Sequence, residues 1–334
     1  KTLVFYLFTT ALAITLALLL ASFIKPGVGI DLSKVSQAVQ ADPAKAVSIK
    51  DTVLNLIPTN PIQAMAEGNM LQIIFFALLV GIILANLGEK AHNVANIFEE
   101  FNDIMMDMTM IVMKFAPIGV FALITKTFAT LGLSAIFSML KYMLTVVLGL
   151  ILQLFLVYMV LLTIFAKANP FKFLKKFFPV LGFAFSTSSS NATVPMNINK
   201  LEELGVSRKI SSFTIPLGAT INMDGTAIMQ GVAVVFAANA YGMQLTPQNF
   251  LTVIAAATLA SVGTAGIPSV GLITLSMVFN SIGLPISAIA MIMGIDRILD
   301  MIRTAINITG DAVCTVIVAN SSGEEYFDKE KFNS

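Results

Sequence analysis

The chain has 334 residues, of which 57% are hydrophobic and 12% charged, and its formal net charge is +1. Soluble domains carry about 25% charged residues, so this composition indicates a membrane protein and gives no sign of a nucleic-acid partner. A single cysteine, Cys314, and a single histidine, His92, exclude a disulfide framework and argue against zinc sites and histidine-based catalysis.

The first half of the chain contains a series of long apolar segments. A hydrocarbon core about 30 Å thick is crossed by a helix of roughly 20 apolar residues. We therefore expect membrane-spanning helices at residues 3–24, 71–87, 105–125 and 142–166. A polar loop follows the first of these, and the stripe of apolar residues between 94 and 101 suits a helix lying at the membrane surface.

Two later segments are too polar or too rich in glycine to be complete spans. Residues 185–195 read Phe-Ser-Thr-Ser-Ser-Ser-Asn-Ala-Thr-Val-Pro and lie between short apolar arms. Residues 261–271 read Ser-Val-Gly-Thr-Ala-Gly-Ile-Pro-Ser-Val-Gly and are flanked in the same way. Non-helical backbone at membrane depth is tolerated only inside protein or beside a cavity. We therefore expect two re-entrant hairpins.

Basic residues are concentrated on one side of the first hairpin. They are Lys167, Lys172, Lys175, Lys176, Lys200, Arg208 and Lys209, whereas the loops near 241–250 and 280–285 carry no charge. Basic loops face the cytoplasm in membrane proteins. The asymmetry predicts a multi-pass protein of the plasma (inner) membrane, with the base of the first hairpin and the C-terminus in the cytoplasm and the charged tail at 324–331 in water.

The apolar span at 213–240 is interrupted by Asn222-Met-Asp-Gly-Thr226, and Asp224 is the one charged residue between 210 and 295. A glycine beside Asn and Asp favours a broken helix that exposes carbonyls next to a carboxylate. Hard cations such as sodium prefer oxygen ligands of this kind.

The last apolar segment, 286–319, carries a polar stripe. Asp296, Asp300, Arg303, Thr304, Asn307 and Asp311 recur at spacings of three and four, which places them on one helix face. An ionised side chain near the bilayer centre costs roughly 2.5–3.5 kcal/mol on insertion scales. A structural Asp300–Arg303 pair would explain one acid and one base, whereas a polar cavity for solutes or ions explains all of these residues.

The hairpins form part of an internal repeat. Ala192-Thr-Val-Pro195 in the first corresponds to Ala265-Gly-Ile-Pro268 in the second, and each proline lies 27 or 28 residues before a polar helix motif. A repeated unit of hairpin and broken helix is typical of secondary transporters, whose sites lie where the repeats meet.

Four motifs in the same order resemble the dicarboxylate/amino acid:cation symporters, the glutamate transporter family. They are Ser-Ser-Ser-Asn-Ala-Thr-Val-Pro at 188–195, Asn-Met-Asp-Gly-Thr at 222–226, Gly-Thr-Ala-Gly-Ile-Pro at 263–268, and the stripe at 296–311 that ends in Gly-Asp. The resemblance covers the whole chain. It implies an all-α polytopic membrane protein with inverted repeats, two re-entrant hairpins and two broken transmembrane helices, assembled as a homotrimer.

The resemblance also implies how the chain is divided. A transport-domain helix would occupy 1–25, mostly scaffold and connecting helices 26–166, the first hairpin 167–205, the broken helix 206–244, the second hairpin 245–284, the last helix 285–320 and a cytoplasmic tail 321–334. The family has two further scaffold helices, which would precede residue 2.

The substrate site implied by the family lies between the hairpins and the last helix. The α-carboxylate would bind at Ser189, Ser190 and the Asn307 amide, the ammonium group at Asp300 beside Thr304, and the side-chain carboxylate at Arg303 and Thr226. Ile267 and Gly271 would close over the ligand from the second hairpin.

Asn191 replaces a serine common at the first tip. Ser188 and Met301 stand where some archaeal and animal members, respectively, carry an arginine, and Arg297 is a possible substitute for it.

The same resemblance implies sites for co-transported sodium ions, three in number. One would use Asp311 with carbonyls of Gly218, Asn222 and Asn307. A second would use Asp224 with Tyr6, Thr9, Thr10 and Asn222, in the motif that also contains Met223. The third would use carbonyls of Thr220, Ser261, Val262 and Thr264.

The expected function is therefore sodium-coupled uptake of acidic amino acids, L-aspartate or L-glutamate, by an elevator-type movement, and not an enzymatic reaction. Two alternatives within the same family are coupling to protons and transport of C4 dicarboxylates or neutral amino acids. Two alternatives from other classes are an anion channel and an intramembrane aspartyl protease using Asp224 and Asp311, although the residues before these aspartates do not match the protease motifs.

Overall fold

The computed structural model describes residues 1–29, 57–67, 70–115, 118–119, 121–122, 125, 134–261, 266, 269–323 and 327–333. In these ranges the chain forms helices, and one isolated antiparallel β-bridge pairs Val206 with Phe327. The helices of the first half are α1 (Thr2–Ile24), α3 (Pro61–Glu67), α4 (Met70–Leu87), η2 (Gly88–Ala91), α5 (His92–Met113), α7 (Ser134–Leu152), η3 (Gln153–Met159) and η4 (Leu162–Ala166). Those of the second half are α8 (Pro170–Thr187), α9 (Ser190–Glu203), α10 (Arg208–Ile221), α11 (Asp224–Ala240), α12 (Pro247–Ser261), α13 (Val270–Ile282), α14 (Ser287–Asn320) and α15 (Lys329–Asn333).

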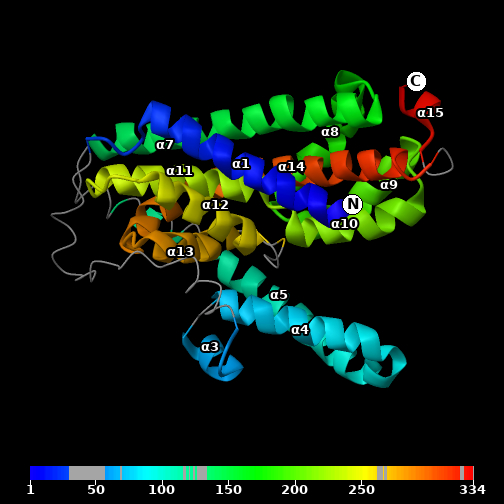
Figure 1. Ribbon diagram of the computed structural model, residues 1–334, viewed down its shortest axis with the longest axis horizontal. Coiled ribbons are helices and arrows are strands. Elements are labelled where there is room, and N and C mark those ends of the chain that lie inside the picture. Colours follow the sequence, from blue (N-terminus) through cyan, green and yellow to red (C-terminus); the bar gives the residue numbers. More distant parts are fainter. Residues whose placement is uncertain are drawn as a thin grey trace.

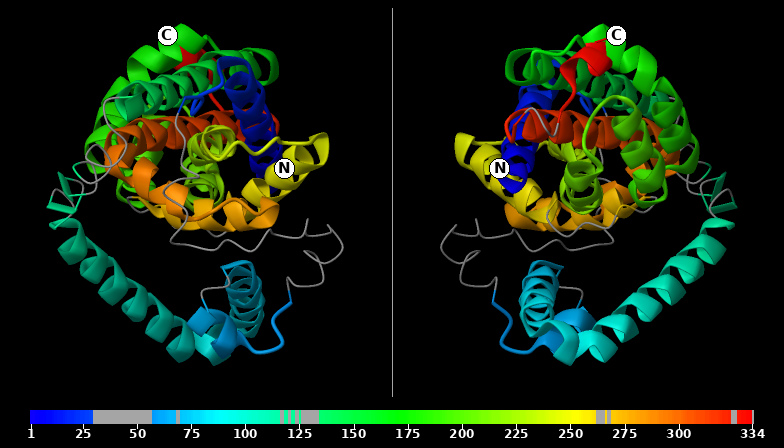
Figure 2. Two further views of the ribbon diagram at one scale, coloured as in Figure 1. Left: turned by 90° about the vertical axis from the view of Figure 1, so that its left-hand side faces the viewer. Right: turned by 90° about the vertical axis from the view of Figure 1, so that its right-hand side faces the viewer.

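Helix α11 lies at the centre of the main body. It packs against α1, α7, α12, α13 and α14, and together these helices form the bundle in Figure 1. Helices α3, α4 and α5 lie to one side of that bundle (Figures 1 and 2). Helices α8, α9 and α10 also pack against α14, so the elements that carry the polar motifs all belong to this bundle.

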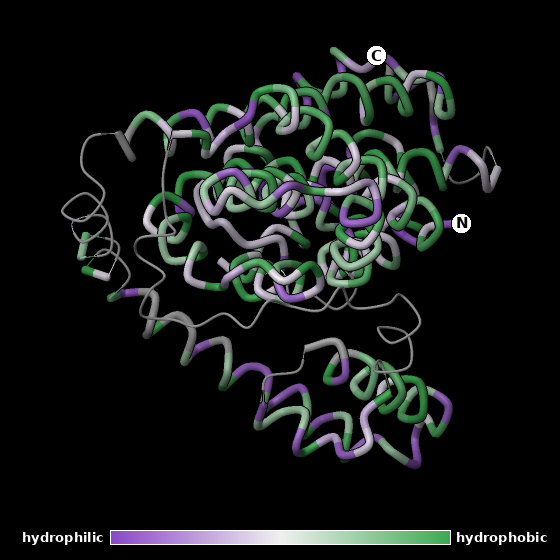
Figure 3. Tube along the Cα trace, turned by 60° about the vertical axis from the view of Figure 1, so that its left-hand side comes forward, coloured by the Kyte–Doolittle hydropathy of each residue, from purple (hydrophilic) through white to green (hydrophobic). Residues whose placement is uncertain are grey.

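Five helices in the described part of the chain are long and apolar enough to cross a membrane. They lie at Thr2–Ile24, Phe75–Met105, Phe137–Ala166, Arg208–Ala240 and Ser287–Asn320. In the fourth, 94% of the most apolar window is buried inside the protein, against 6% in the second. Figure 3 shows hydrophilic positions recurring along the helix that lies apart from the bundle. The acidic residues of α5 are Glu99, Glu100, Asp103 and Asp107.

The expected helices are largely confirmed, with differences in their boundaries. The spans expected at 3–24, 71–87 and 142–166 correspond to α1, α4 and the run from α7 to η4, which begins earlier, at Ser134. The surface helix and the span expected at 105–125 are not separate, because α5 runs from His92 to Met113. Its apolar residues continue past the expected boundary, and much of the remainder up to 125 lies outside the described residues.

The first hairpin is a pair of helices joined by a very short tip. Helix α8 ends at Thr187, Ser188 adopts a left-handed conformation with φ 51°, and α9 begins at Ser190. Ser189 caps α9, since its hydroxyl accepts a hydrogen bond from the Ala192 N–H at 3.3 Å. The polar residues 190–195 are therefore helical. The second hairpin, α12 and α13, has the same arrangement of arms, and residues 262–265 and 267–268 of its tip lie outside the described part of the chain.

The break in the central span is confirmed. Helix α10 ends at Ile221 and α11 begins at Asp224, with Asn222 extended at φ −84° and ψ 94°. The Asn222 N–H still donates to the Gly218 carbonyl at 2.8 Å, which closes the last turn of α10. This break leaves the side chains of Asn222 and Asp224 inside the bundle.

The resemblance implies a second broken helix, with its break near Gly310 in the last apolar segment, and this prediction is wrong, because α14 is one continuous helix from Ser287 to Asn320 that passes through Gly310. Gly310 has a different role, which is to allow close packing. A Cβ atom at this position would contact the Tyr158 hydroxyl and lie 2.6 Å from Asn222 Nδ2. Glycine in a helix can mark either a break or a close approach, and sequence spacing alone does not separate them.

The tail was expected to return to water, but part of it packs against the base of the first hairpin. Phe332 is fully buried, and its ring lies 6.0 Å from that of Phe173 and 5.3 Å from that of Phe327. The Asp328 N–H donates to the Gly205 carbonyl at 2.8 Å, and Lys176 Nζ donates to the Phe332 carbonyl at 3.2 Å. The tail thus joins α8 to the α9–α10 turn.

Replacing Phe332 by alanine should lower the free energy of unfolding by about 3 kcal/mol, because truncation of a buried phenylalanine removes its apolar contacts and leaves a cavity. Thermal unfolding in detergent measures the change. Phe171→Ala is the matched control, since this phenylalanine of α8 is 75% exposed. Equal stability of the two variants would show that the tail contact contributes nothing.

Candidate functional site

Polar side chains from distant parts of the chain meet inside the bundle in two groups. We call Asp296, Asp300 and Arg303 the arginine cluster, which lies on α14. We call Asp224 and Asp311, with the side chains that bond them, the aspartate cluster, which lies between α1, η3, α11 and α14. All the carboxylates of both clusters are buried.

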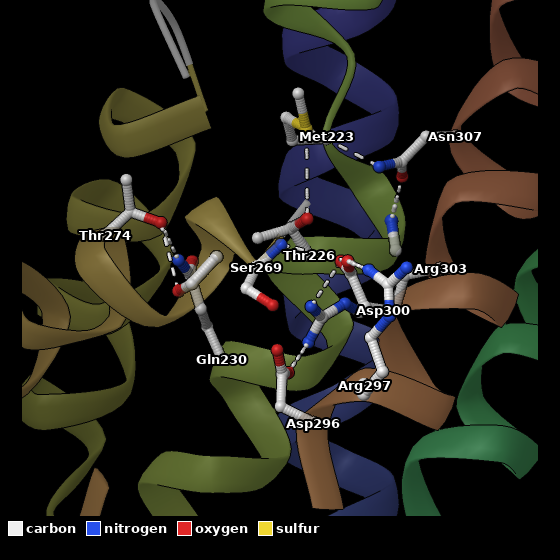
Figure 4. A network of polar contacts seen from close by, with 12 residues as sticks. Met223, Thr226, Gln230, Ser269, Thr274, Asp296, Arg297, Asp300, Arg303 and Asn307 are labelled. Atoms are coloured by element: carbon white, nitrogen blue, oxygen red, sulfur yellow. Dashed lines mark hydrogen bonds and ion pairs between the residues drawn. The ribbon is translucent and has the colours of Figure 1, made fainter. Parts of the chain in front are cut away.

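The arginine cluster is an internally paired set of charges. Arg303 Nη1 donates to Asp296 Oδ1 at 2.7 Å, and Nη2 donates to Asp300 Oδ1 at 2.8 Å (Figure 4). Arg303 and Asp296 are each 1% exposed. Arg303 Nε and Asp296 Oδ2 have no hydrogen-bond partner among the described residues, so the cluster retains a donor and an acceptor for a ligand.

The second hairpin is bonded directly to this cluster. The Ser269 N–H donates to Asp300 Oδ2 at 2.9 Å. Two residues further on, a Cβ atom at Gly271 would lie 2.9 Å from the Thr226 methyl carbon and 3.5 Å from Arg303 Nη2. Gly271 therefore lies against Thr226 and Arg303, two of the residues predicted to bind substrate, and Ile267 lies outside the described residues.

Two potential ligand donors are bonded only weakly. Asn307 Nδ2 donates to the Met223 sulfur at 3.5 Å, and the Thr226 hydroxyl donates to the same sulfur at 3.8 Å (Figure 4). A thioether is a weak hydrogen-bond acceptor. The Asn307 amide and the Thr226 hydroxyl can therefore exchange it for a stronger acceptor on a ligand at little cost in free energy. Asn307 Oδ1, in contrast, is fixed by the Gly225 N–H at 2.7 Å. Thr304 is buried one residue beyond Arg303.

The tips of the two hairpins touch at Gly266. The Ser189 hydroxyl donates to the Gly266 carbonyl at 2.9 Å, and the Asn191 N–H donates to it at 3.3 Å. A Cβ atom at Gly266 would lie 3.0 Å from the Ser190 Cβ and 2.7 Å from the Ala219 carbonyl oxygen. The structure therefore brings Ser189 and Ser190 against the second hairpin, above the broken helix.

In the aspartate cluster, Asp224 is bonded by three neutral side chains. Thr10 Oγ1 donates to Oδ1 at 2.6 Å, while Gln153 Nε2 and the Tyr158 hydroxyl donate to Oδ2 at 2.9 and 2.8 Å. Asp224 itself is fully buried. Hydrogen bonds to a charged group stabilise it strongly, so these donors allow a carboxylate to lie inside the bundle.

Asp311 is bonded through Asn222. Asn222 Nδ2 donates to Asp311 Oδ1 at 2.8 Å and to the Asn307 carbonyl at 2.9 Å. Gly218 lies against this group, since a Cβ atom there would contact the Asp311 carboxylate and lie 2.6 Å from the Tyr6 hydroxyl. Asp311 Oδ2 and Asn222 Oδ1 are buried without a partner among the described residues.

The other residues predicted to bind cations lie in different environments. Tyr6, Thr9 and Thr10 are fully buried on α1, with the Tyr6 hydroxyl donating to the Thr214 carbonyl at 3.1 Å and the Thr9 hydroxyl to the Tyr6 carbonyl at 3.2 Å. The Thr220 side chain is exposed, and the Ser261 hydroxyl bonds within its own helix at 2.7 Å. Val262 and Thr264 lie outside the described residues.

Four site residues were not assigned a role from the sequence: Asp296, Ser269, Gln153 and Tyr158. The spacing places Asp296 on the helix face of Arg303, and what was not assigned is its role as the ion-pair partner of that arginine. Ser269 acts through its backbone N–H, and the pattern of side chains in a sequence does not indicate where a backbone N–H will donate. Gln153 and Tyr158 are five residues apart, a spacing that does not share a face on an α-helix.

Replacing Gly310 by alanine should lower the free energy of unfolding by about 1–3 kcal/mol, as overpacking does. At a helix position with open space around it, replacing glycine by alanine stabilises the helix by about 1 kcal/mol. The change expected at Gly310 therefore has the opposite sign. Gly182→Ala in α8 is the control, because no atom lies within 4 Å of a Cβ atom there. Thermal unfolding measures the stability of both variants. A Gly310→Ala protein at least as stable as the Gly182→Ala protein would contradict the packing role of Gly310.

The sequence is similar to known transport proteins over its whole length. Residues 1–321 match the Sodium:dicarboxylate symporter family. The chain is 35% identical to the proton/glutamate-aspartate symporter of Bacillus subtilis (strain 168), covering 100% of this chain and 81% of the relative. It is 35% identical to the proton/sodium-glutamate symport protein of the same organism, covering 97% and 76%. It is 31% identical to the C4-dicarboxylate transport protein of that organism, covering 99% and 79%.

These matches agree with the all-α architecture and with the five helices that are able to span a membrane. They also remove the intramembrane protease as an alternative, because the family consists of transporters. The chain is a multi-pass membrane protein that belongs to the Sodium:dicarboxylate symporter family.

Proposed function

We propose that this protein couples sodium influx to the uptake of acidic amino acids, L-aspartate or L-glutamate, across the plasma (inner) membrane. The observation that carries the proposal is the arginine cluster, a guanidinium buried between two carboxylates beside weakly bonded donors. A ligand with one ammonium group and two carboxylates can bond every one of these groups. Relatives named as glutamate or glutamate-aspartate symporters support this choice of substrate.

In this proposal the ligand replaces contacts that the protein makes with itself. Its ammonium group binds Asp300, which bonds the Ser269 N–H and Arg303 in the structure. Its side-chain carboxylate binds Arg303, whose fork can hold a carboxylate through two parallel hydrogen bonds, and the Thr226 hydroxyl assists. The α-carboxylate accepts from the Asn307 amide and from the tip at Ser189 and Ser190. Thr304 lies beside the amino group.

Other substrates of the family fit this site less well. A C4 dicarboxylate, the substrate named for one relative, has no ammonium group, and its two charges would face Asp300. A neutral amino acid offers no side-chain carboxylate to Arg303, which would be a penalty if the guanidinium had no other partner. The ion pair with Asp296 at 2.7 Å removes that penalty, so selection against neutral ligands rests on the unpaired Nε of Arg303. This makes a neutral amino acid the strongest alternative.

Sodium coupling is supported by buried oxygens that lack donors. Asp311 Oδ2 and Asn222 Oδ1 have no hydrogen-bond partner among the described residues, and leaving a buried acceptor unsatisfied costs about 1–3 kcal/mol. A cation held by oxygen ligands would satisfy both. The first proposed ion binds Asp311 with carbonyls of Gly218, Asn222 and Asn307, and the second binds Asp224 with Tyr6, Thr9, Thr10 and Asn222. The motif containing Met223 supplies the backbone between them.

A proton on Asp311 is the competing explanation, since a protonated carboxyl would act as a donor. Both glutamate symporters of Bacillus subtilis reported above are named for protons, and the second is named for sodium as well. The third proposed ion, at Thr220, Ser261, Val262 and Thr264, rests on family resemblance alone. The same holds for the homotrimer and for the elevator movement. A cytoplasmic C-terminus and base of the first hairpin are supported by the distribution of basic residues.

Replacing Arg303 by cysteine should abolish high-affinity aspartate binding and shift the preference to small neutral amino acids, because the site then lacks its carboxylate partner. Arg297→Cys is the matched control on the same helix, since its contact with Asp300 is a distant 3.9 Å ion pair. Competition binding with aspartate, succinate and serine measures the change. Near-normal aspartate affinity in the Arg303 variant would refute the assignment.

Aspartate affinity should rise steeply with sodium concentration, because the occupied cation sites and the closed second hairpin stabilise the same conformation. Coupling between two binding sites is reciprocal, so aspartate must raise the sodium affinity by the same factor. Calorimetric titration at several sodium concentrations, with choline holding the ionic strength constant, tests this. An affinity that follows pH and ignores sodium would establish a proton symporter instead.

A further inference from the structure

Asp224 is held by two side chains that the proposed cation sites do not use. Gln153 Nε2 and the Tyr158 hydroxyl both donate to Oδ2, at 2.9 and 2.8 Å. Gln153 and Tyr158 are fully buried, as is Asp224. Both come from η3, the π-helical stretch that follows α7, and so from an element that carries none of the family motifs.

The two oxygens of Asp224 have different surroundings. A carboxylate oxygen has two lone-pair positions, and on Oδ2 both are taken by donors. Oδ1 accepts one hydrogen bond, from the Thr10 hydroxyl at 2.6 Å. A hydroxyl group can rotate and present a lone pair to a cation, whereas an amide NH₂ group cannot. Oδ1 and Thr10 are therefore the side of the carboxylate suited to an ion.

The π-helical geometry explains why these two residues act together. Positions five apart on an α-helix are separated by about 140°, given 100° per residue. The wider turn of a π-helix, with its i to i+5 hydrogen bonds, brings such positions onto one face. Short π-helical stretches are rare and occur frequently at functional sites. In this protein the stretch Gln153–Met159 begins at one donor and includes the other.

Tyr158 also contacts the helix that carries Asp311. A Cβ atom at Gly310 would lie 2.6 Å from Tyr158 Cζ and would contact its hydroxyl group. The tyrosine side chain therefore lies between α11 and α14, bonded to Asp224 and packed against the glycine that precedes Asp311. Gln153 Oε1 is a buried acceptor without a partner among the described residues, so the amide has capacity for a further contact in the same place.

We propose that Gln153 and Tyr158 are positioning residues for the cation at Asp224, which anchor Oδ2 and thereby direct Oδ1 and Thr10 at the ion. The inference rests on the proposed function, because it presupposes sodium at Asp224. It predicts a role in cation affinity for an element outside the recognised motifs.

A purely structural role makes a different prediction. If the two donors only compensate a buried charge, their loss lowers the stability and the aspartate affinity at every sodium concentration alike. If they position the carboxylate, their loss raises the sodium concentration required and leaves the aspartate affinity at saturating sodium unchanged. The sodium concentration required for binding and the aspartate affinity at saturating sodium, measured together, therefore distinguish a structural role from a positioning role.

The test uses the full-length protein with Tyr158→Phe and, separately, Gln153→Met, which removes both the donor and the amide oxygen. Tyr142→Phe is the matched control, since Tyr142 is also fully buried, lies on the preceding helix α7, and has a hydroxyl group without a hydrogen-bond partner among the described residues. Two quantities are measured: aspartate affinity across sodium concentrations, and the rise in unfolding temperature caused by sodium alone.

We expect both test variants to need about tenfold more sodium for half-maximal binding, as loss of a hydrogen bond to a charged group implies. Their aspartate affinity at saturating sodium should match that of the Tyr142 control, and sodium alone should stabilise them less than it stabilises the control. A sodium requirement equal to that of the control, or a lower one, would overturn the inference.

Asp224→Asn separates failure of this inference from failure of the proposed function. If that variant loses its sodium dependence while Tyr158→Phe and Gln153→Met keep theirs, the cation site stands and the positioning role is refuted. If Asp224→Asn keeps the full sodium dependence of the unchanged protein, no cation binds at Asp224 and the inference is overturned, while sodium coupling through Asp311 stands. The proposed function itself is overturned if aspartate binding to the unchanged protein ignores sodium.

Discussion

The charge of Arg303 is kept inside an apolar bundle by two carboxylates, and this ion-paired group sets the conditions for the rest of the site. Breaking a buried pair by removing one partner typically costs 3–5 kcal/mol, according to measurements on other proteins. Asp296 at 2.7 Å and Asp300 at 2.8 Å supply the compensation. Any ligand that takes one of these partners must therefore return an equivalent charge, which restricts the chemistry that the site can accept.

Close approach of the helices is what allows the two clusters to form, and glycine provides it at three positions. Gly218 makes room for the Asp311 carboxylate, Gly310 for Tyr158 and Asn222, and Gly271 for Thr226 and Arg303. At each one a Cβ atom would come within 3.0 Å of at least one named neighbour, and at Gly271 it would also lie 3.5 Å from Arg303 Nη2. The polar groups can reach one another in the bundle only because these side chains are absent.

The sequence predicted the parts of this site that follow a helical or motif-based pattern. The stripe on α14, the break at Asn222 and the paired hairpin arms all come from spacing that one helix or one repeat determines. The contacts that were missed depend on tertiary structure: Ser269 acts through its backbone, and Gln153 and Tyr158 share a face only on a π-helix. Gly310 was misjudged because a glycine that permits packing looks the same in a sequence as one that ends a helix. The burial of Phe332 depends on a contact with Phe173, more than a hundred residues earlier, which no local pattern reveals.

Asn307 connects the two clusters physically. Its carbonyl accepts from Asn222, which bonds Asp311, while its side-chain oxygen holds the first turn of α11 at Gly225. Its amide nitrogen faces the Met223 sulfur at 3.5 Å, beside the arginine cluster. An ion that draws in the Asn307 carbonyl would shift the same residue whose amide is proposed to bind the α-carboxylate. Coupling between two sites requires an element whose position both ligands change. Asn307 lies on α14 between Arg303 and Asp311, and it meets that requirement because the proposed ion bonds its carbonyl and the proposed substrate bonds its amide.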